Sequence, residues 1–197
     1  MILEGVVTTL NPDGRVSVSP MGPRVTSSMD TLILRPYRSS QTYQNLKIHG
    51  EGVFHVTDDV ELLAHAAVSR VDPPTARARE VDGYYLPDAC RFYEFRVIRL
   101  DDREERTTIE ATVVRTERLR DFFGFHRARH AVVEAAILAT RTAFIPIPEI
   151  LEKLDELQIL VEKTGGEVER RAFEFLRSYV SAERATPNVP KAPGGVR

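Results

Sequence analysis

The sequence of 197 residues contains a single cysteine, Cys90, and no tryptophan. One cysteine excludes an internal disulfide and a cysteine metal cluster within one chain, so we expect a reducing compartment and a cytoplasmic protein. No stretch approaches the roughly 18 consecutive apolar residues of a membrane span. The first residues, MILEGVVTTLNPDG, also lack the basic and long apolar regions of a targeting leader. We therefore expect no membrane partner.

A strong charge of either sign is missing as well. The 27 basic and 29 acidic residues give a formal charge of −2 and are mixed along the chain, so no basic block predicts a nucleic-acid partner. The motifs GxGxxG, GxxxxGK[ST] and GxSxG do not occur, which excludes the usual Rossmann, P-loop and α/β-hydrolase interpretations. His126 and His130 have the i, i+4 spacing of metal ligands on a helix, but no further ligand completes a site, so no metal is expected.

The periodicity of the apolar residues predicts an α+β fold. Residues 1–126 alternate in the manner of roughly six strands, with two short helices inserted near 40–49 and 58–68 and a long loop over 69–90. From residue 127 the pattern becomes helical, and 127–185 are expected to form a C-terminal helical region that ends in an antiparallel hairpin. The Pro- and Gly-rich tail, 186–197, is expected to be disordered.

The helical hairpin is predicted from two apolar stripes that flank the TGG break at 164–166. Each stripe has the a/d-like spacing of a helix that packs along one face. The two stripes are Ile150, Leu154, Leu157 and Val161, then Val168, Ala172, Phe175 and Tyr179.

The stretch RPYRSSQTYQNL, 35–46, concentrates hydroxyl side chains between an apolar strand and a helix. A helix N-terminus offers free backbone N–H groups and the positive end of the helix dipole, which together bind phosphate. Ser39, Ser40 and Thr42 would add hydroxyl donors, and Arg35 or Arg38 would add a counter-charge. A plain Ser N-cap beside a solvated loop explains the same residues equally simply.

The second candidate is the segment SPMGPR, 19–24, in which two prolines and a glycine leave the backbone accessible. A planar ring system can lie against such a segment and bond to its amides. An ordinary turn at the end of a strand is the competing interpretation.

The third candidate is the arginine-rich segment RLRDFFGFHRARH, 118–130. It suits an anion site or a solvated entry to a helix, and its three phenylalanines, Phe122, Phe123 and Phe125, suit core or interface contacts better than base stacking.

Taken in order, TTLNPDGRVSVSPMG, DTLILRPYRSSQTYQNL, GEGVFHVTDD and ELLAHAAV resemble the flavin-reductase-like, FMN-binding split-barrel superfamily. Within it the chain is most similar to an uncharacterised family of archaeal and bacterial flavoproteins that also carries a motif like FFGFHRARHAVVEAAILATR. The resemblance covers residues 1 to about 145. It implies a split β-barrel with Greek-key-like order in residues 1–126, and a homodimer that binds FMN near the subunit interface. The helical region would pack on the barrel or on the dimer interface.

The resemblance also implies where the cofactor lies. The flavin ring would lie by the 19–22 segment and the phosphate by the start of the 40–49 helix. The family motif reads Asn-Arg-Ala where this chain has His126, Arg127 and Ala128, which puts the role of position 126 in doubt. The implied cofactor residues are Ser19, Pro20, Met21, Gly22, Leu34, Arg35, Pro36, Ser39, Thr42, Tyr43 and Asn45, and the weaker substrate candidates are Arg127 and His130.

Three functions fit this pattern. The first is an FMN-dependent reductase that takes hydride from a donor such as NADH or NADPH and passes it to a second substrate. The second is a non-catalytic FMN carrier or sensor. The third is an FMN-free scaffold whose helical hairpin binds a partner protein. The sequence names neither the catalytic residues, the electron donor and acceptor, nor the pathway.

Overall fold

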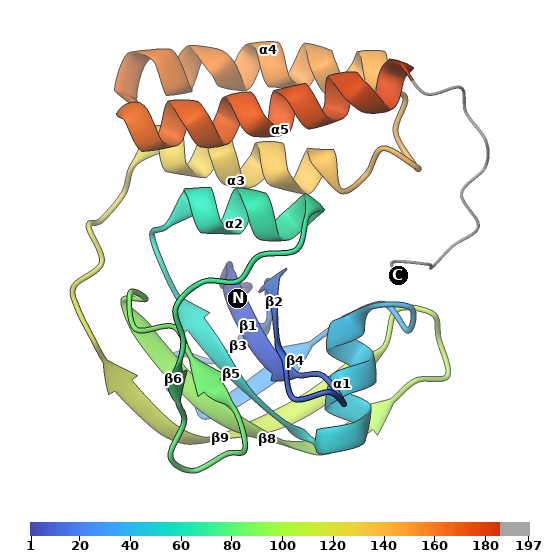
Figure 1. The fold of residues 1–197 in the computed structure, drawn as a ribbon, viewed down its shortest axis with the longest axis vertical. Coiled ribbons are helices and arrows are strands. Elements are labelled where there is room, and N and C mark those ends of the chain that lie inside the picture. Colours follow the sequence, from blue (N-terminus) through green and yellow to red (C-terminus); the bar gives the residue numbers. More distant parts are fainter. Residues whose placement is uncertain (186–197) are drawn as a thin grey trace. The chain divides into compact units, whose positions relative to one another are not determined.

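The structure is a computed structural model and describes residues 1–185; the tail expected to be disordered lies outside the described residues. The chain divides into two compact units, one built on a β-sheet and one of helices (Figure 1). The sheet unit contains 1–57 and 72–122, and the helical unit contains 58–71 and the described residues from 123 onward. In the described part of the chain no helix is both long and apolar enough to cross a membrane.

The main sheet has seven antiparallel strands in the order β2-β1-β5-β8-β9-β4-β3. Their bounds are Gly5–Leu10 (β1), Val16–Met21 (β2), Arg24–Val25 (β3), Thr31–Leu34 (β4), Glu51–Val56 (β5), Arg91–Asp101 (β8) and Thr108–Arg118 (β9). The fold is the α+β barrel predicted from the sequence, with one strand more than expected because β3 is only two residues long.

The N-terminus closes this sheet into a barrel. Leu3 donates its amide to the Pro23 carbonyl at 3.1 Å, and Val25 donates its amide to the Met1 carbonyl at 2.8 Å. Residues 1–3 therefore pair with β3 and then continue into β1, so that the last strand of the sheet order is joined to one of the first. This pairing covers the outer edge of β3, whereas β2 pairs only with β1 in the strand order of the described residues.

The β1–β2 hairpin follows from its turn residues. Asn11 and Arg15 bond through their backbones at 2.9 Å, and Gly14 takes a φ of 80°, which favours glycine. Leu10 lies opposite Val16 and Gly5 opposite Met21, so the turn sets the register of the whole hairpin.

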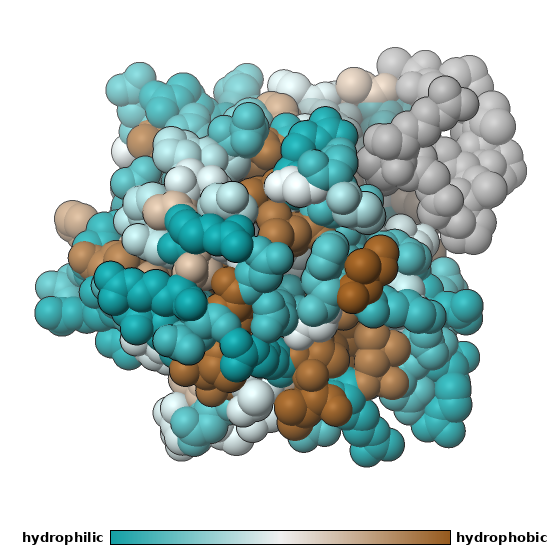
Figure 2. Space-filling view, turned by 60° about the horizontal axis from the view of Figure 1, so that its bottom comes forward, coloured by the Kyte–Doolittle hydropathy of each residue, from teal (hydrophilic) through white to brown (hydrophobic). Residues whose placement is uncertain are grey.

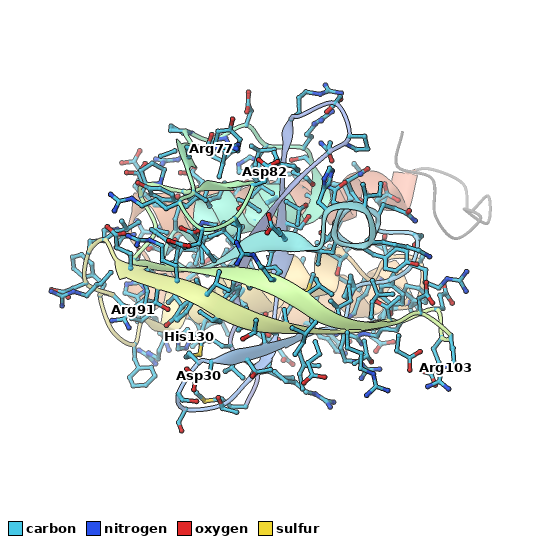
Figure 3. The ribbon with its side chains drawn as sticks, turned by 90° about the horizontal axis from the view of Figure 1, so that it is seen from below. Asp30, Arg77, Asp82, Arg91, Arg103 and His130 are labelled. Atoms are coloured by element: carbon cyan, nitrogen blue, oxygen red, sulfur yellow. The ribbon has the colours of Figure 1, made fainter. Side chains whose placement is uncertain are left out.

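Helix α1, Gln41–His49, packs against β1 and β2 and buries Thr42, Tyr43, Asn45 and Leu46. Leu46 and Tyr43 join the barrel core, which is filled mainly by alternating residues of β4, β5, β8 and β9. The expected loop over 69–90 contains one further hairpin, formed by β6 (Ala76–Arg77) and β7 (Tyr84–Tyr85). Figure 3 shows Arg77 and Asp82 of this loop facing each other, and their side chains form an ion pair at 2.6 Å.

The helical unit consists of four helices that lie side by side (Figure 1). They are α2 (Val60–Val68), α3 (Arg127–Ala139), α4 (Ile147–Thr164) and α5 (Glu167–Ala185). The predicted hairpin corresponds to α4 and α5, but α2, which the sequence analysis placed in the barrel domain, packs with α3 and α5. Alanines on α3 face this core, which allows neighbouring helices to approach closely.

The predicted α4 stripe is correct at Ile150, Leu154 and Val161, which are buried. The predicted α5 stripe is correct at Ala172, which is buried, and Phe175 and Tyr179 pack against the same core, whereas Val168 is exposed. The stripe is too narrow, since it omits the buried Phe173, Leu176 and Val180. The reason is that α5 packs against α2 and α3 as well as α4, so its buried arc is wider than the seam of a two-helix hairpin.

Candidate functional site

The start of helix α1 has the features of an anion site. Ser40 is the N-cap, and its Oγ accepts the Tyr43 amide at 3.2 Å, while no acidic residue occupies the first turn. The amides of Gln41 and Thr42 have no earlier helical carbonyl to bond. Thr42 is only 3% exposed, and no hydrogen bond of its hydroxyl is found within residues 1–185. Ser39 lies exposed just before the cap.

The segment that leads into α1 is held rigidly by residues 105–107. Pro36 accepts bonds from both the amide and the hydroxyl of Thr107, at 3.0 and 2.8 Å. Arg38 donates its amide to the Glu105 carbonyl at 2.8 Å. The backbone on both sides of the arginine-rich turn is therefore fixed before any ligand binds.

Arg35 is the most unusual side chain of this segment. Its carbonyl accepts a bond from Arg106, but its own Nε is buried and has no hydrogen-bond partner within the described residues. A buried, unsatisfied charged donor is costly and is rare in native proteins. An anionic ligand would satisfy this donor.

Other predicted cofactor residues belong to the packing of the barrel. Leu34 and Pro36 are buried, and Leu34 is part of the core. Asn45 donates to Thr9 Oγ1 and Asn11 Oδ1, each at 2.9 Å. Its Oδ1 accepts from a glutamine one turn earlier. Both donors of the Asn45 amide are thus used to fix α1 on β1.

Tyr43 lies in a second polar contact of α1. Its hydroxyl donates to Asp102 at 2.7 Å and accepts from Lys47 at 3.0 Å, and Lys47 also bonds to Asp102 at 2.8 Å. These bonds, first that from Lys47 and then that from Tyr43, lower the pKa of Asp102. The pKa of Lys47 is raised by its own bonds, first that to Asp102 and then that to Tyr43. Tyr43 is only 3% exposed, and its bonds therefore fix the helix.

The segment expected to lie by a flavin ring forms the end of strand β2. Ser19, Pro20 and Met21 are half-buried, and Pro20, which has no N–H, sits on a strand whose only partner within the seven-stranded order is β1. A Cβ at Gly22 would come within 2.8 Å of both carboxylate oxygens of Glu4. Helix α1 packs against these same two strands, but Asn45 attaches it to Thr9 and Asn11 at the turn end of the hairpin, whereas residues 19–21 pair with the opposite end of β1.

The buried His55 bonds to strand β1, which pairs with this segment. His55 Nε2 accepts the Leu86 amide at 3.0 Å, so the proton is assigned to Nδ1, which donates to the Val6 carbonyl at 3.1 Å. Val6 lies opposite Pro20 on one side and His55 on the other. Burial lowers the pKa of His55 to about 4, and only the bond to Val6 opposes this shift.

The third candidate segment belongs to the helical unit from Phe123 onward. His126 is the N-cap of α3, and its Nδ1 accepts the Arg129 amide at 3.3 Å. The His126 side chain therefore acts as the N-cap of α3 in this chain. Arg127 and His130 are exposed at the same end of α3, and the His130 ring meets Phe125 edge-on.

Arg129, in contrast, forms ion pairs with Asp58 at 3.1 Å and with Glu169 at 2.9 Å, and these ion pairs fix the helices. Phe123 and Phe125 are 86% and 100% exposed, so they do not pack in a core, and the alternative of interface contacts stays a prediction. No group of three or more His, Cys, Asp or Glu side chains that could hold a metal ion is found in the described part of the chain.

Sequence reasoning missed the Arg106–Tyr37 contact, the Asn45 network and the His55 bonds. Arg106 lies over the Tyr37 ring at 5.6 Å. Each of these contacts joins segments far apart in sequence, so no local spacing signals it.

Comparison with known proteins places both parts of the chain. Residues 3–120 match the N-terminal domain of a family of proteins of unknown function, DUF447, and residues 126–178 match the second region of the same family. None of the curated proteins matches the chain.

Several solved structures share the fold. An FMN-bound protein from Methanosarcina mazei, assigned to DUF447, aligns over 90% of this chain and 94% of its own with 19% identity and a TM-score of 0.78. The 2-nitrobenzoate 2-nitroreductase of Pseudomonas fluorescens aligns over 58% and 63% with 14% identity and a TM-score of 0.53. An FMN-binding protein of Thermus thermophilus aligns over 59% and 70% with 14% identity and a TM-score of 0.53. At these identities the likeness establishes the fold.

Proposed function

Because the chain belongs to the DUF447 family of proteins of unknown function and its barrel has the fold of FMN-binding proteins, we propose that it binds FMN and acts as a flavin-dependent oxidoreductase. Two observations carry the proposal: the Nε of Arg35 is buried and has no hydrogen-bond partner within the described residues, and the first-turn amides of α1, a few residues further along the chain, have no earlier helical carbonyl to bond. This arrangement fits a phosphate dianion.

We assign the phosphate to Arg35, Ser39 and Thr42 and the flavin ring to the 19–22 segment. Ser19, Pro20 and Met21 are half-buried, as expected of a surface that a flat, partly apolar ring would cover. Leu34, Pro36, Tyr43 and Asn45 would act indirectly, since their bonds and packing hold the elements that carry the contacts.

When bound, FMN accepts and donates hydride or single electrons. The residues of this chain would bind and orient it, with NADH or NADPH as candidate electron donor. The nitroreductase that shares the fold supports an oxidoreductase by analogy of fold alone. Arg127 and His130 remain candidates for binding an anionic substrate. A cytoplasmic location of the protein remains a prediction.

The first experiment is the visible spectrum of the purified protein, before and after incubation with FMN and desalting. Retained flavin bands support the proposal, and their bleaching by NADH or NADPH distinguishes a reductase from a non-catalytic carrier. A colourless protein that releases all FMN would refute the flavoprotein assignment and leave the scaffold function.

The phosphate assignment predicts the result of a double substitution. Replacing Ser39 and Thr42 with alanine removes two hydroxyl donors to a dianion, worth together about 3 kcal/mol, so FMN should bind on the order of a hundredfold more weakly. Quenching of flavin fluorescence measures the affinity, and circular dichroism checks the fold. Ser178→Ala, on the exposed face of α5, is the control. Unchanged affinity in the double variant would place the phosphate elsewhere.

We also propose that the protein is a homodimer. Figure 2 shows hydrophobic residues in several groups on one face of the molecule, and exposed apolar groups of this kind often mark interfaces. In the sheet unit the exposed large hydrophobic residues are Met1, Ile2, Tyr37, Ile48, Ile98 and Phe122. Sedimentation equilibrium tests the proposal, since a dimer has twice the 22.3 kDa of the chain.

A further inference from the structure

An acidic side chain, Glu4, lies against the 19–22 segment to which we assign the flavin ring. The antiparallel ladder between β1 and β2 continues, in the same register, to the bridge between Ile2 and Arg24. This register places Glu4 directly opposite Gly22. Opposite residues of an antiparallel pair have neighbouring side chains on one face of the sheet, so Glu4 and Ile2 lie on the face that Gly22 leaves bare.

The space that a side chain at Gly22 would occupy is filled by these two neighbours. A Cβ at Gly22 would lie 2.7 and 2.8 Å from the two carboxylate oxygens of Glu4, and 2.9 Å from Cγ2 of Ile2. Glu4 and Ile2 are both exposed residues, so a ligand can reach them. A planar ring that lies by this segment would therefore meet the Glu4 carboxylate, with Ile2 as its apolar neighbour.

A carboxylate at this place does not help to hold FMN. The FMN phosphate is a dianion, and a further negative charge near the cofactor repels it. A glutamine of nearly the same size would offer an acceptor and two donors without this repulsion. The charge is suited instead to distinguishing the two redox forms of the ring. The oxidised ring is neutral, whereas the ring that has taken up a hydride carries one negative charge near neutral pH, so a neighbouring carboxylate disfavours the reduced form.

We propose that Glu4 lowers the reduction potential of bound FMN and so makes the reduced flavin a stronger electron donor. The inference rests on the proposed function, because it needs the flavin ring at the 19–22 segment. A hydride from the donor brings two electrons and one proton to the ring, and the same hydride leaves to the acceptor. Glu4 exchanges neither electrons nor protons in these steps and acts through its charge alone. A lowered potential suits a reductase better than a carrier that only shields FMN.

The test compares the midpoint potential of bound FMN in the wild type and in Glu4→Gln. Reductive titration against a dye of known potential, followed in the visible spectrum, measures this potential without turnover. Low ionic strength is needed, because salt screens exposed charges. Loss of the charge should favour the reduced form over the oxidised form about tenfold, which raises the potential of a two-electron couple by about 30 mV. The affinity for oxidised FMN should change less than about threefold, because the oxidised ring is neutral.

Two further variants separate the charge of Glu4 from other effects. Glu4→Asp keeps the charge, so it should change the same ratio less than about twofold. Glu80→Gln is the matched control, because Glu80 is exposed and its amide bonds to Glu94 on β8, which β5 separates from β1 in the sheet. This control should leave the potential unchanged.

The outcomes separate this inference from FMN binding itself. A rise of the potential in Glu4→Gln that neither Glu4→Asp nor Glu80→Gln reproduces would support the inference. An unchanged potential in Glu4→Gln, or an equal rise in either of the other variants, would overturn it while the proposed FMN binding stands. A wild-type protein that retains no FMN would instead refute the proposed function and the inference with it.

Discussion

Acidification should destabilise the barrel through His55. The loss of unfolding free energy is set by how far burial lowers the pKa of this histidine. The folded protein holds this histidine neutral with a pKa of about 4, against an ordinary value of 6.5. Between these values the unfolded chain binds the proton more readily, so stability falls as the pH drops from 6.5 towards 4. A difference of about 2.5 units, at 1.36 kcal/mol per unit, gives a full loss of about 3.4 kcal/mol, of which about 2 kcal/mol is already lost at pH 5.

Urea unfolding at pH 7.5, 6 and 5, followed by circular dichroism because the chain has no tryptophan, measures this loss. His55→Gln cannot titrate in this range, so it should be less stable than the wild type at pH 7.5 but lose about 2 kcal/mol less on going to pH 5. His49→Gln, at an exposed position of α1, controls for the loss of a histidine. An equal loss in the wild type and in His55→Gln would refute the reasoning.

Two further substitutions test the packing of the barrel. Glu94 is fully buried, and its carboxylate accepts hydrogen bonds from the amides of residues 79–81. Glu94→Gln should therefore lower the free energy of unfolding by about 3 kcal/mol and speed hydrogen exchange of these amides. Glu104→Gln, at an exposed position, should change neither quantity. Normal exchange there would show that the loop is held by other contacts. A Cβ at Gly5 would lie 2.2 Å from the carbonyl oxygen of His55, so Gly5→Ala should lower stability by at least about 2 kcal/mol. At Gly83 the nearest atom would be 3.6 Å away, and a thermal melt of Gly83→Ala equal to that of Gly5→Ala would contradict this explanation.

The barrel could be predicted from the sequence because its signals are local. The alternation of apolar residues and the NPDG turn each act within a few residues, and the structure contains the corresponding strands and hairpin. The two-residue strand β3 escaped prediction, because its pairing depends on residues 1–3 and on β4. Residues 1–3 are far from β3 in the sequence, so this pairing leaves no periodic pattern of apolar residues.

The candidate site could be predicted only in part, for a related reason. Ser40 caps α1, as the hydroxyl-rich stretch predicted, and the free amides beyond it follow from helix geometry. Whether a polar residue on the helix faces a ligand or the sheet depends on tertiary contacts, and Asn45 is committed to the sheet by its bonds to β1. Likewise, the exposure of Phe125 could not be inferred from its apolar character.

The assignment of α2 to the helical unit has a consequence for synthesis and for cloning. Helix α2 leaves the ribosome about 60 residues before α3 begins, which at about 10 residues per second is roughly 6 s. During that time Val60, Leu63 and Ala64 lack the helices that later cover them. The nascent chain therefore exposes a short apolar segment that lies, in sequence, between the two parts of the barrel. A fragment ending at residue 122 would keep this segment uncovered permanently. Neither unit can therefore be obtained by a single cut, and a soluble barrel requires that 58–71 be replaced by a polar linker.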